Sequence, residues 1–246
     1  MNESIYENMR DLSEHNWWFL VQGKIIQYFL GNCLKGNRNL NILDAGSGTG
    51  RLYGVLSRYG NVFGVEPHRG ASQLCKEKGY KKVINDSLEK IGFPDNSFDV
   101  IVCVDVLEHV EKDQNALKEC YRVLKKGGYF LITVPAGQLF FSKNELQYGH
   151  FRRYDNIPFR EKIQQAGFKI SMITHFNFLL LPPIVLIRMV INILISMRIV
   201  KKPMGELASP EIFNRMFKFI FGLELKLLKR VRIPFGLSLL AVARKS

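Results

Sequence analysis

The stretch Asn41-Ile-Leu-Asp-Ala-Gly-Ser-Gly-Thr-Gly-Arg51 joins a short apolar run to an aspartate and three glycines at alternate positions. The apolar run predicts a strand, and a helix-forming segment begins after Gly50. Glycine lacks a Cβ and tolerates positive φ, so such a turn lets backbone and a helix N-terminus approach a ligand closely. The next apolar run, 61–66, ends in Glu66. A carboxylate there can accept both ribose hydroxyls of an adenosine. The pattern therefore predicts a nucleotide site at the carboxyl ends of two neighbouring strands.

The G-x-G-x-G spacing, with an acid two residues upstream, resembles motif I of the class I S-adenosylmethionine-dependent methyltransferases. Three further segments agree with that family in order and spacing: Asn85-Asp-Ser87, Ser97–His109 and Leu124–Pro135. The resemblance covers roughly residues 15–175 plus the last strand. It implies a Rossmann-like, mostly parallel sheet of seven strands with an antiparallel last strand and helices on both faces. It also implies S-adenosylmethionine as the cofactor, and the chain is similar to the ubiquinone-biosynthesis and polysaccharide-cluster members.

The resemblance also assigns cofactor residues. The glycine loop would lie against the methionine part, Glu66 at the ribose, residues 86–88 near the adenine, and residues 103–105 at the methionine end. The full set is Asp44, Gly46, Ser47, Gly48, Glu66, Pro67, Asp86, Ser87, Cys103 and Val104. A solvated strand-end carboxylate is the simpler interpretation of Asp44 and Glu66, but the glycines between them favour the nucleotide role. For Asp86, a local turn or helix cap stays open.

The rest of the chain alternates apolar, β-branched runs with helix-length segments, which is typical of a parallel sheet buried on both faces. We expect strands at 40–44, 61–66, 82–85, 98–103, 128–134 and 168–176. Helices are expected at 7–34, 49–59, 68–78, 113–124 and 157–166. The seventh strand has one good candidate, Leu237–Arg244. The predicted organisation is a cofactor-binding core with an N-terminal helical lid (1–176), a helical insertion (177–236), and the final core strand (237–246).

Composition limits the class of protein. A chain of 246 residues suits one α/β domain with a large core. The four cysteines, at positions 33, 75, 103 and 120, form no C-x-x-C pair. This disfavours a disulfide framework or a zinc ribbon and fits a reducing cytosol. The polar, acidic N-terminus lacks the features of a secretory signal. We therefore expect a cytoplasmic protein, and its oligomeric state stays open.

The insertion carries most of the positive charge of its half of the chain. Residues 151–246 hold 17 Lys and Arg against 5 Asp and Glu, and the insertion alone holds 10 against 3. Its first part, Phe178–Val200, is the most apolar run, but Arg188, Arg198 and the Pro182-Pro183 pair weigh against a spanning helix. Its second part predicts a basic amphipathic helix beginning at Ser209-Pro-Glu211, which is typical of peripheral binding to an anionic membrane surface. Packing as core or as a dimer interface is the alternative.

Catalytic candidates lie after the fourth and fifth strands. His109 follows Asp105-Val-Leu-Glu108, where ubiquinone-biosynthesis O-methyltransferases place a cluster that resembles a divalent-metal site. Asp105 replaces the first glutamate of that pattern, so we predict no metal, and a polar helix-start network or a general base stays open. His150 heads His-Phe-Arg-Arg-Tyr154 in the segment that closes over the acceptor in this family. It could take a proton from a hydroxyl, and Arg152 or Arg153 could clamp a phosphate or carboxylate. A structural role in capping and pairing is the alternative for His150, Arg152 and Arg153.

Trp17-Trp-Phe19 is either a lid against the cofactor or plain core. The leading hypothesis is a methyltransferase for a small or lipid-linked acceptor, by O- or C-methylation, at the inner membrane surface. An RNA or DNA methyltransferase is the alternative suggested by the charge. Against it, the loop after the fourth strand lacks the Asn/Asp-Pro-Pro-aromatic turn of base-amino methyltransferases, so nucleic acid is disfavoured. A catalytically silent scaffold that binds the cofactor is a third hypothesis.

Overall fold

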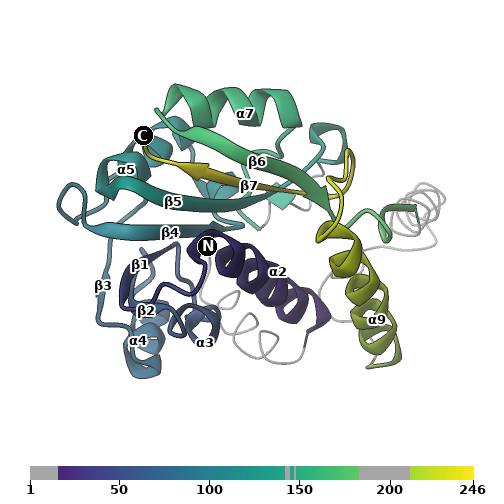
Figure 1. Ribbon diagram of the computed structural model, residues 1–246, viewed down its shortest axis with the longest axis horizontal. Coiled ribbons are helices and arrows are strands. Elements are labelled where there is room, and N and C mark those ends of the chain that lie inside the picture. Colours follow the sequence, from purple (N-terminus) through teal and green to yellow (C-terminus); the bar gives the residue numbers. More distant parts are fainter. Residues whose placement is uncertain (1–15, 142–144, 147, 183–210) are drawn as a thin grey trace.

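One mixed sheet of seven strands organises the chain (Figure 1). The computed structural model describes residues 16–141, 145–146, 148–182 and 211–246. The strands are β1 (Leu40–Ala45), β2 (Gly60–Val65), β3 (Lys82–Ile84), β4 (Phe98–Val104), β5 (Leu124–Pro135), β6 (Lys169–Phe176) and β7 (Ser238–Arg244). Their order is β3-β2-β1-β4-β5-β7-β6, and β7 runs antiparallel to both β5 and β6. The predicted fold class is confirmed.

Helices cover both faces of this sheet. They are α2 (Trp17–Leu34), α3 (Tyr53–Leu56), α4 (Arg69–Lys78), α5 (Asp113–Val123), α7 (Asn156–Gln165) and α9 (Glu211–Leu228), with 3-10 turns η1 (Leu107–His109) and η2 (Gln138–Phe140). The expected helix at 49–59 is shorter than predicted, because residues up to 52 belong to the glycine turn. Residues 7–15 of the helix expected at 7–34 lie outside the described residues.

Strand alternation divides the core between the two faces. Along β4, Ile101 and Cys103 join the cluster that also contains residues of α5 and α7. Val100, Val102 and Val104 face the other way, into a cluster with residues of α2 and α9. Figure 1 shows α7 above the sheet and α2, α3 and α4 below it. The central strands are therefore buried on both sides, as their continuous apolar runs predict.

The strand order reverses beside β1, because β1 pairs in parallel with both β2 and β4. In open α/β sheets, ligands bind in the crevice outside the carboxyl ends of strands at such a point. The segments that leave β1, β2 and β4 begin at Gly46, Glu66 and Asp105. The fold thus brings three segments that are distant in sequence to one edge of the sheet.

The second half of the insertion forms α9, which packs against α2 (Figure 1). Trp17 contacts the rings of Phe217 and Phe221 at centroid distances of 5.1 and 5.6 Å, so this tryptophan belongs to a packed core. Its backbone N–H donates to Oδ1 of Asn214 at 2.6 Å. The buried carboxylate of Glu224 accepts N–H groups from residues 177–179, just after β6. One face of α9 is therefore tied to α2 and to the segment after β6.

The apolar first half of the insertion lies largely outside the described residues, at 183–210. Among the helices that the structure does describe, none combines the length and the apolar character needed to span a bilayer.

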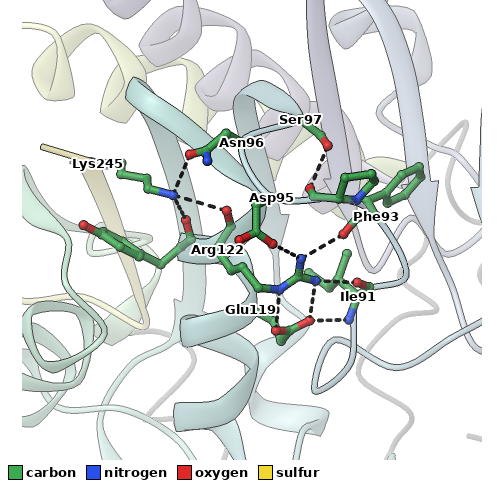
Figure 2. Close-up of polar contacts among 10 residues, drawn as sticks. Ile91, Phe93, Asp95, Asn96, Ser97, Glu119, Arg122 and Lys245 are labelled. Carbon is green, nitrogen blue, oxygen red and sulfur yellow. Dashed lines mark hydrogen bonds and ion pairs between the residues drawn. The ribbon is translucent and has the colours of Figure 1, made fainter.

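A polar network fixes the loop between β3 and β4 (Figure 2). The guanidinium of Arg122 donates to both carboxylate oxygens of Glu119, to Asp95, and to the carbonyls of Ile91 and Phe93, at 2.6–3.0 Å. Lys245, after β7, donates to Oδ1 of Asn96 and to two carbonyls at the end of α5. These contacts are structural, and they join the C-terminus to the sheet.

Candidate functional site

The glycine turn after β1 adopts a backbone that suits glycine. Gly46, Gly48 and Gly50 have φ of 79°, 52° and 73°, in the left-handed region. A Cβ on Gly46 would lie 2.5 Å from Cγ1 of Val106, so the loop packs closely against the segment after β4. A Cβ on Gly48 would meet nothing within 4 Å. Gly46 is thus required by packing, whereas Gly48 faces open space where a ligand can approach the backbone.

Glu66 stands at the end of β2 and is held by backbone N–H groups. Its Oε2 accepts from Gly48 at 2.9 Å, and its Oε1 accepts from His68 at 2.9 Å. The residue is 3% exposed, and its own carbonyl accepts from Nδ2 of Asn85 at 3.1 Å. The structure therefore couples Glu66 to the glycine turn at the end of β2.

Asp44, the last acid of β1, is buried and paired with a tyrosine that motif analysis did not identify. The hydroxyl of Tyr80 donates to its Oδ2 at 2.6 Å. Burial raises the pKa of Asp44 to about 6, opposed by the Tyr80 hydrogen bond and the positive charge of Arg51. A nearby cation would favour the ionised form. Asp44 is therefore suited to a positively charged ligand group.

The remaining predicted cofactor residues differ in how they face the site. Oδ1 of Asp86 accepts from the N–H of Ser87 at 2.9 Å, a local turn contact. Ser47 is buried and its hydroxyl accepts from Sγ of Cys75 at 3.4 Å, while Pro67 is exposed. Cys103 and Val104 point into the two core clusters on opposite faces of β4. These two can line the site through their backbone.

Asp105 has φ of 53°, an uncommon value for a residue other than glycine, at the carboxyl end of β4. Its Oδ2 accepts from Nε2 of Gln22 at 2.6 Å, and its Oδ1 accepts from the hydroxyl of Thr133 at 2.8 Å. Oε1 of Gln22 in turn accepts from Nη2 of Arg51 at 2.6 Å. Helix α2 thus closes over the strand ends through one buried glutamine. Sequence reasoning missed Gln22, because its partners lie 29 and 83 residues away.

His109 and His150 form an edge-to-face pair with ring centroids 4.5 Å apart. Nδ1 of His109 donates to the carbonyl of Gly149 at 3.2 Å. Burial, followed by the neighbouring His150, lowers the pKa of His109 to about 4, so this imidazole stays neutral at physiological pH. Nδ1 of His150 lies 3.6 Å from Oε1 of Glu145 and has no hydrogen-bond partner among the described residues. The fold brings together two histidines that are 41 residues apart.

Arg153 is committed to contacts within the chain. Its Nε and Nη2 each lie 2.7 Å from Oε1 of Glu145, and its Nη1 donates to the carbonyl of Ala136 at 3.1 Å. Arg152 pairs with Asp113 at 2.9 Å and donates to the carbonyl of Glu111. These contacts favour a positioning role, with Arg153 holding the acid beside His150.

Glu108 completes this cluster. It is 1% exposed, its Oε2 has no described hydrogen-bond partner, and burial raises its pKa well above the ordinary value. One ligand atom each from Glu108, His109 and His150 lies within 4.8 Å of the others. These three are the described residues that could hold a metal ion. A buried carboxyl with a raised pKa beside two imidazoles is also suited to exchanging protons, and the absence of metal stays a prediction.

Residues 43–132 match the family model of the methyltransferase domain. A probable S-adenosylmethionine-dependent methyltransferase from Mycolicibacterium smegmatis is 28% identical over 166 residues, covering 65% of this chain and 62% of the relative. A ubiquinone/menaquinone biosynthesis C-methyltransferase from Citrobacter koseri is 32% identical over 143 residues, covering 52% of this chain and 54% of the relative. The chain thus spans less than two thirds of the length of these curated relatives.

A solved structure from Thermotoga maritima, described as an S-adenosylmethionine-dependent methyltransferase and possible histamine N-methyltransferase, shares the fold. The superposition covers 99% of this chain and 96% of the Thermotoga maritima chain, with a TM-score of 0.61 and 19% sequence identity. The similarity extends over the whole sheet and supports the fold, while the identity is too low to transfer a substrate.

Proposed function

The chain carries a class I S-adenosylmethionine-dependent methyltransferase domain, and we propose that it transfers a methyl group from that cofactor to a small or lipid-linked acceptor, by O- or C-methylation. The observation that carries this proposal is the coupling of Gly48 to Glu66 at the switch point of the sheet. It presents an open glycine backbone and a buried carboxylate side by side. A nucleoside with an amino-acid tail needs both.

The residues present fit this cofactor. The space beside Gly48 admits a ligand against the backbone. Glu66, at the end of β2 beside the glycine turn, is our proposed acceptor for the ribose hydroxyls, and Asp44 offers a carboxyl to the ammonium of the methionine part. Asp86 and Ser87 lie near the start of the segment after β3, which the resemblance assigns to the adenine. When bound, the cofactor supplies an activated methyl group on a sulfonium, so positioning of the acceptor is the main task left to the protein.

His150 is our proposed general base for a hydroxyl acceptor. Its imidazole lies beside Glu145 and against the neutral ring of His109. A proton taken by His150 would be stabilised by the Glu145 carboxylate, which Arg153 holds in place. The buried Glu108 and the half-buried His109 lie beside that ring. For a carbon acceptor the same group would remove the proton from the methylated carbon.

We further propose that the protein works at an anionic membrane surface. The outer face of α9 exposes Met216, Phe219, Leu223 and Leu227, with exposed fractions of 44, 69, 44 and 40%. The spacing of three and four residues places them along one side of the helix. Arg215 and Lys226 are exposed on the same helix, Lys229 and Arg230 are exposed just after its end, and Glu224 is buried. An apolar stripe flanked by cations, with Glu224 buried, matches the requirement for an interfacial helix.

Charge adds to this attraction. Each Lys or Arg close to an anionic leaflet contributes about 1 kcal/mol. Four exposed cations on α9 and just after it complement the apolar stripe, and a lipid-linked acceptor would be met at that surface. The proposed location is therefore cytoplasmic, with peripheral attachment to the inner face of the membrane.

The direct test is incubation of the full chain with S-adenosylmethionine labelled in its methyl group and with total cell extract. Label recovered in the organic phase supports a lipid-linked acceptor, and label in small aqueous metabolites supports a soluble one. Label in RNA or DNA would favour the nucleic-acid alternative. Tight binding of the cofactor with no labelled product under any condition would favour a silent scaffold and would contradict the proposed activity.

A further inference from the structure

Arg51 follows the glycine turn directly, and the protein satisfies its guanidinium only in part. Nη2 donates to Oε1 of Gln22, and the guanidinium carbon lies 5.2 Å from the ring centre of Phe19. Nη1 is buried and has no hydrogen-bond partner in the part of the chain that the structure describes. A buried charged donor without a partner is costly, so such a group in a native fold indicates a missing ligand or water.

The carboxylates whose charge acts on Arg51 are Asp105 and Asp44. Both are engaged by other donors. The two oxygens of Asp105 accept from Gln22 and Thr133, and Oδ2 of Asp44 accepts from Tyr80. Gln22 accepts from Arg51 and donates to Asp105, so it holds the guanidinium at a fixed place beside the carboxyl ends of β1 and β4. The cation Arg51 and the carboxylates of Asp44 and Asp105 therefore meet at the carboxyl ends of β1 and β4.

Building on the proposed function, we propose that Nη1 of Arg51 binds the carboxylate of the amino-acid tail of the cofactor, with Gln22 orienting the guanidinium. Asp44 and Asp105 then face the ammonium of the same tail. A guanidinium suits a carboxylate because it offers several N–H donors in a fixed plane. The opposite charges of the tail would each meet a buried partner of opposite sign.

This arrangement has a consequence for specificity. A nucleoside that keeps the adenosine and the sulfur but lacks the carboxylate would leave Nη1 unpaired. The site would then discriminate against decarboxylated cofactor, because a polar group built to be paired rejects a ligand that cannot pair it. It would also connect cofactor binding to helix α2, since Gln22 lies on that helix.

The test is titration calorimetry of the full chain with S-adenosylhomocysteine and with its decarboxylated analogue, which keeps the ammonium. We expect the wild type to bind S-adenosylhomocysteine about 10- to 100-fold more tightly than the analogue. Arg51→Met should weaken S-adenosylhomocysteine by about that factor and change the analogue less than about threefold. Arg51→Lys should recover part of the preference, since it restores the charge without the fork.

Each outcome bears on one claim. Equal affinity of the wild type for the two ligands would overturn the assignment of Arg51, and this measurement needs no variant that might fail to fold. Equal weakening of both ligands by Arg51→Met would also overturn it, since that result indicates a structural role. Wild-type protein that binds neither ligand would instead contradict the proposed function itself.

Discussion

The hydroxyl of Tyr80 donates a 2.6 Å hydrogen bond to Oδ2 of Asp44, joining the segment after α4 to the end of β1. The bond opposes the effect of burial, which raises the pKa of Asp44 to about 6. Asp44 is therefore a carboxyl whose charge depends on pH near neutrality and on what binds beside it. The proposed cofactor site therefore contains a carboxyl group that titrates near pH 6.

We predict that affinity for S-adenosylhomocysteine rises as the pH increases through 6, because the ligand ammonium favours ionised Asp44. Tyr80→Phe removes a hydrogen bond that lowers the Asp44 pKa, so it should move the midpoint to higher pH. Asp44→Asn should abolish the pH dependence and weaken binding. Calorimetry between pH 5 and 8 measures all three. A wild-type affinity that stays constant over this range would contradict the assignment of Asp44.

The same titration affects folding with a definite sign. Since the folded pKa exceeds that of the unfolded chain, the folded state binds more protons between about pH 4 and 6. The contribution to the free energy of unfolding is therefore full below about pH 4 and is lost as the pH rises through 6, by up to about 3 kcal/mol. Urea titrations of ligand-free protein at several pH values measure this effect, and Asp44→Asn should lose this pH dependence of the free energy of unfolding.

Gly48 and Gly54 form a matched pair for testing the glycine turn. Neither has an atom within 4 Å of a built Cβ, but only Gly48 has a left-handed φ, at 52°. We predict that Gly48→Ala weakens S-adenosylhomocysteine at least about tenfold, because the methyl group strains the loop and fills the ligand space. Gly54→Ala, in helix α3, should leave affinity unchanged. Equal affinities of the two variants would indicate that the ligand does not approach Gly48.

His150→Ala should lower kcat about 10²- to 10⁴-fold, the range typical of general acid–base catalysis, with little change in affinity for S-adenosylhomocysteine. The reason is that the contacts of His150 are with Glu145 and His109 rather than with the glycine turn. Measurements of kcat and of binding on the same preparation separate the two effects. Parallel loss of both would indicate a structural role. Activity that disappears with a chelator and returns with a divalent cation would instead contradict the predicted absence of metal.

Phe219 and Leu223 are the central residues of the apolar stripe on α9. We predict that the double change Phe219→Asp and Leu223→Asp abolishes co-sedimentation with anionic vesicles at low salt. Ile157→Asp is the control, because Ile157 is 70% exposed on α7, above the sheet in Figure 1. Wild-type protein that stays entirely in the supernatant would contradict the membrane proposal, and a shift in oligomeric state of the α9 variant would favour a dimer interface.

Arg122→Met should lower the free energy of unfolding by about 1–3 kcal/mol, because it removes the hydrogen bonds that fix the loop after β3 (Figure 2). The guanidinium is partly exposed, which limits the loss. Urea denaturation measures the effect, and the folded variant should bind S-adenosylhomocysteine like the wild type. Loss of affinity without loss of stability would show that this network supports the cofactor site.

The local patterns of the sequence located the strands, except that β5 begins at Leu124, four residues before its predicted start at residue 128. Each strand of the core is a short apolar run between turn residues, so the predicted ranges agree with β1, β2 and β4 to within one residue. The glycine turn and Glu66 could be placed because their spacing is itself the signal. The expected helix at 49–59 was too long, since periodicity does not show where a left-handed turn ends.

The contacts that tune the site could not be predicted in this way. Gln22, Tyr80 and Glu224 are polar residues on helices or in connections, with no motif around them. Their partners lie 83, 36 and about 46 residues away, respectively. Only the three-dimensional fold shows that each is buried against a charge or a row of N–H groups. Cys103 illustrates the converse, because it follows the family pattern while its side chain lies in the core.

The most direct test of the central claim is calorimetry of S-adenosylhomocysteine binding to the wild type and to Glu66→Ala. The account predicts one molecule bound per chain and a loss of at least about tenfold in affinity when the Glu66 carboxylate is removed, with the variant still folded. Absence of any binding heat for the wild type, or unchanged affinity of Glu66→Ala, would contradict a nucleoside site at the carboxyl ends of β1 and β2.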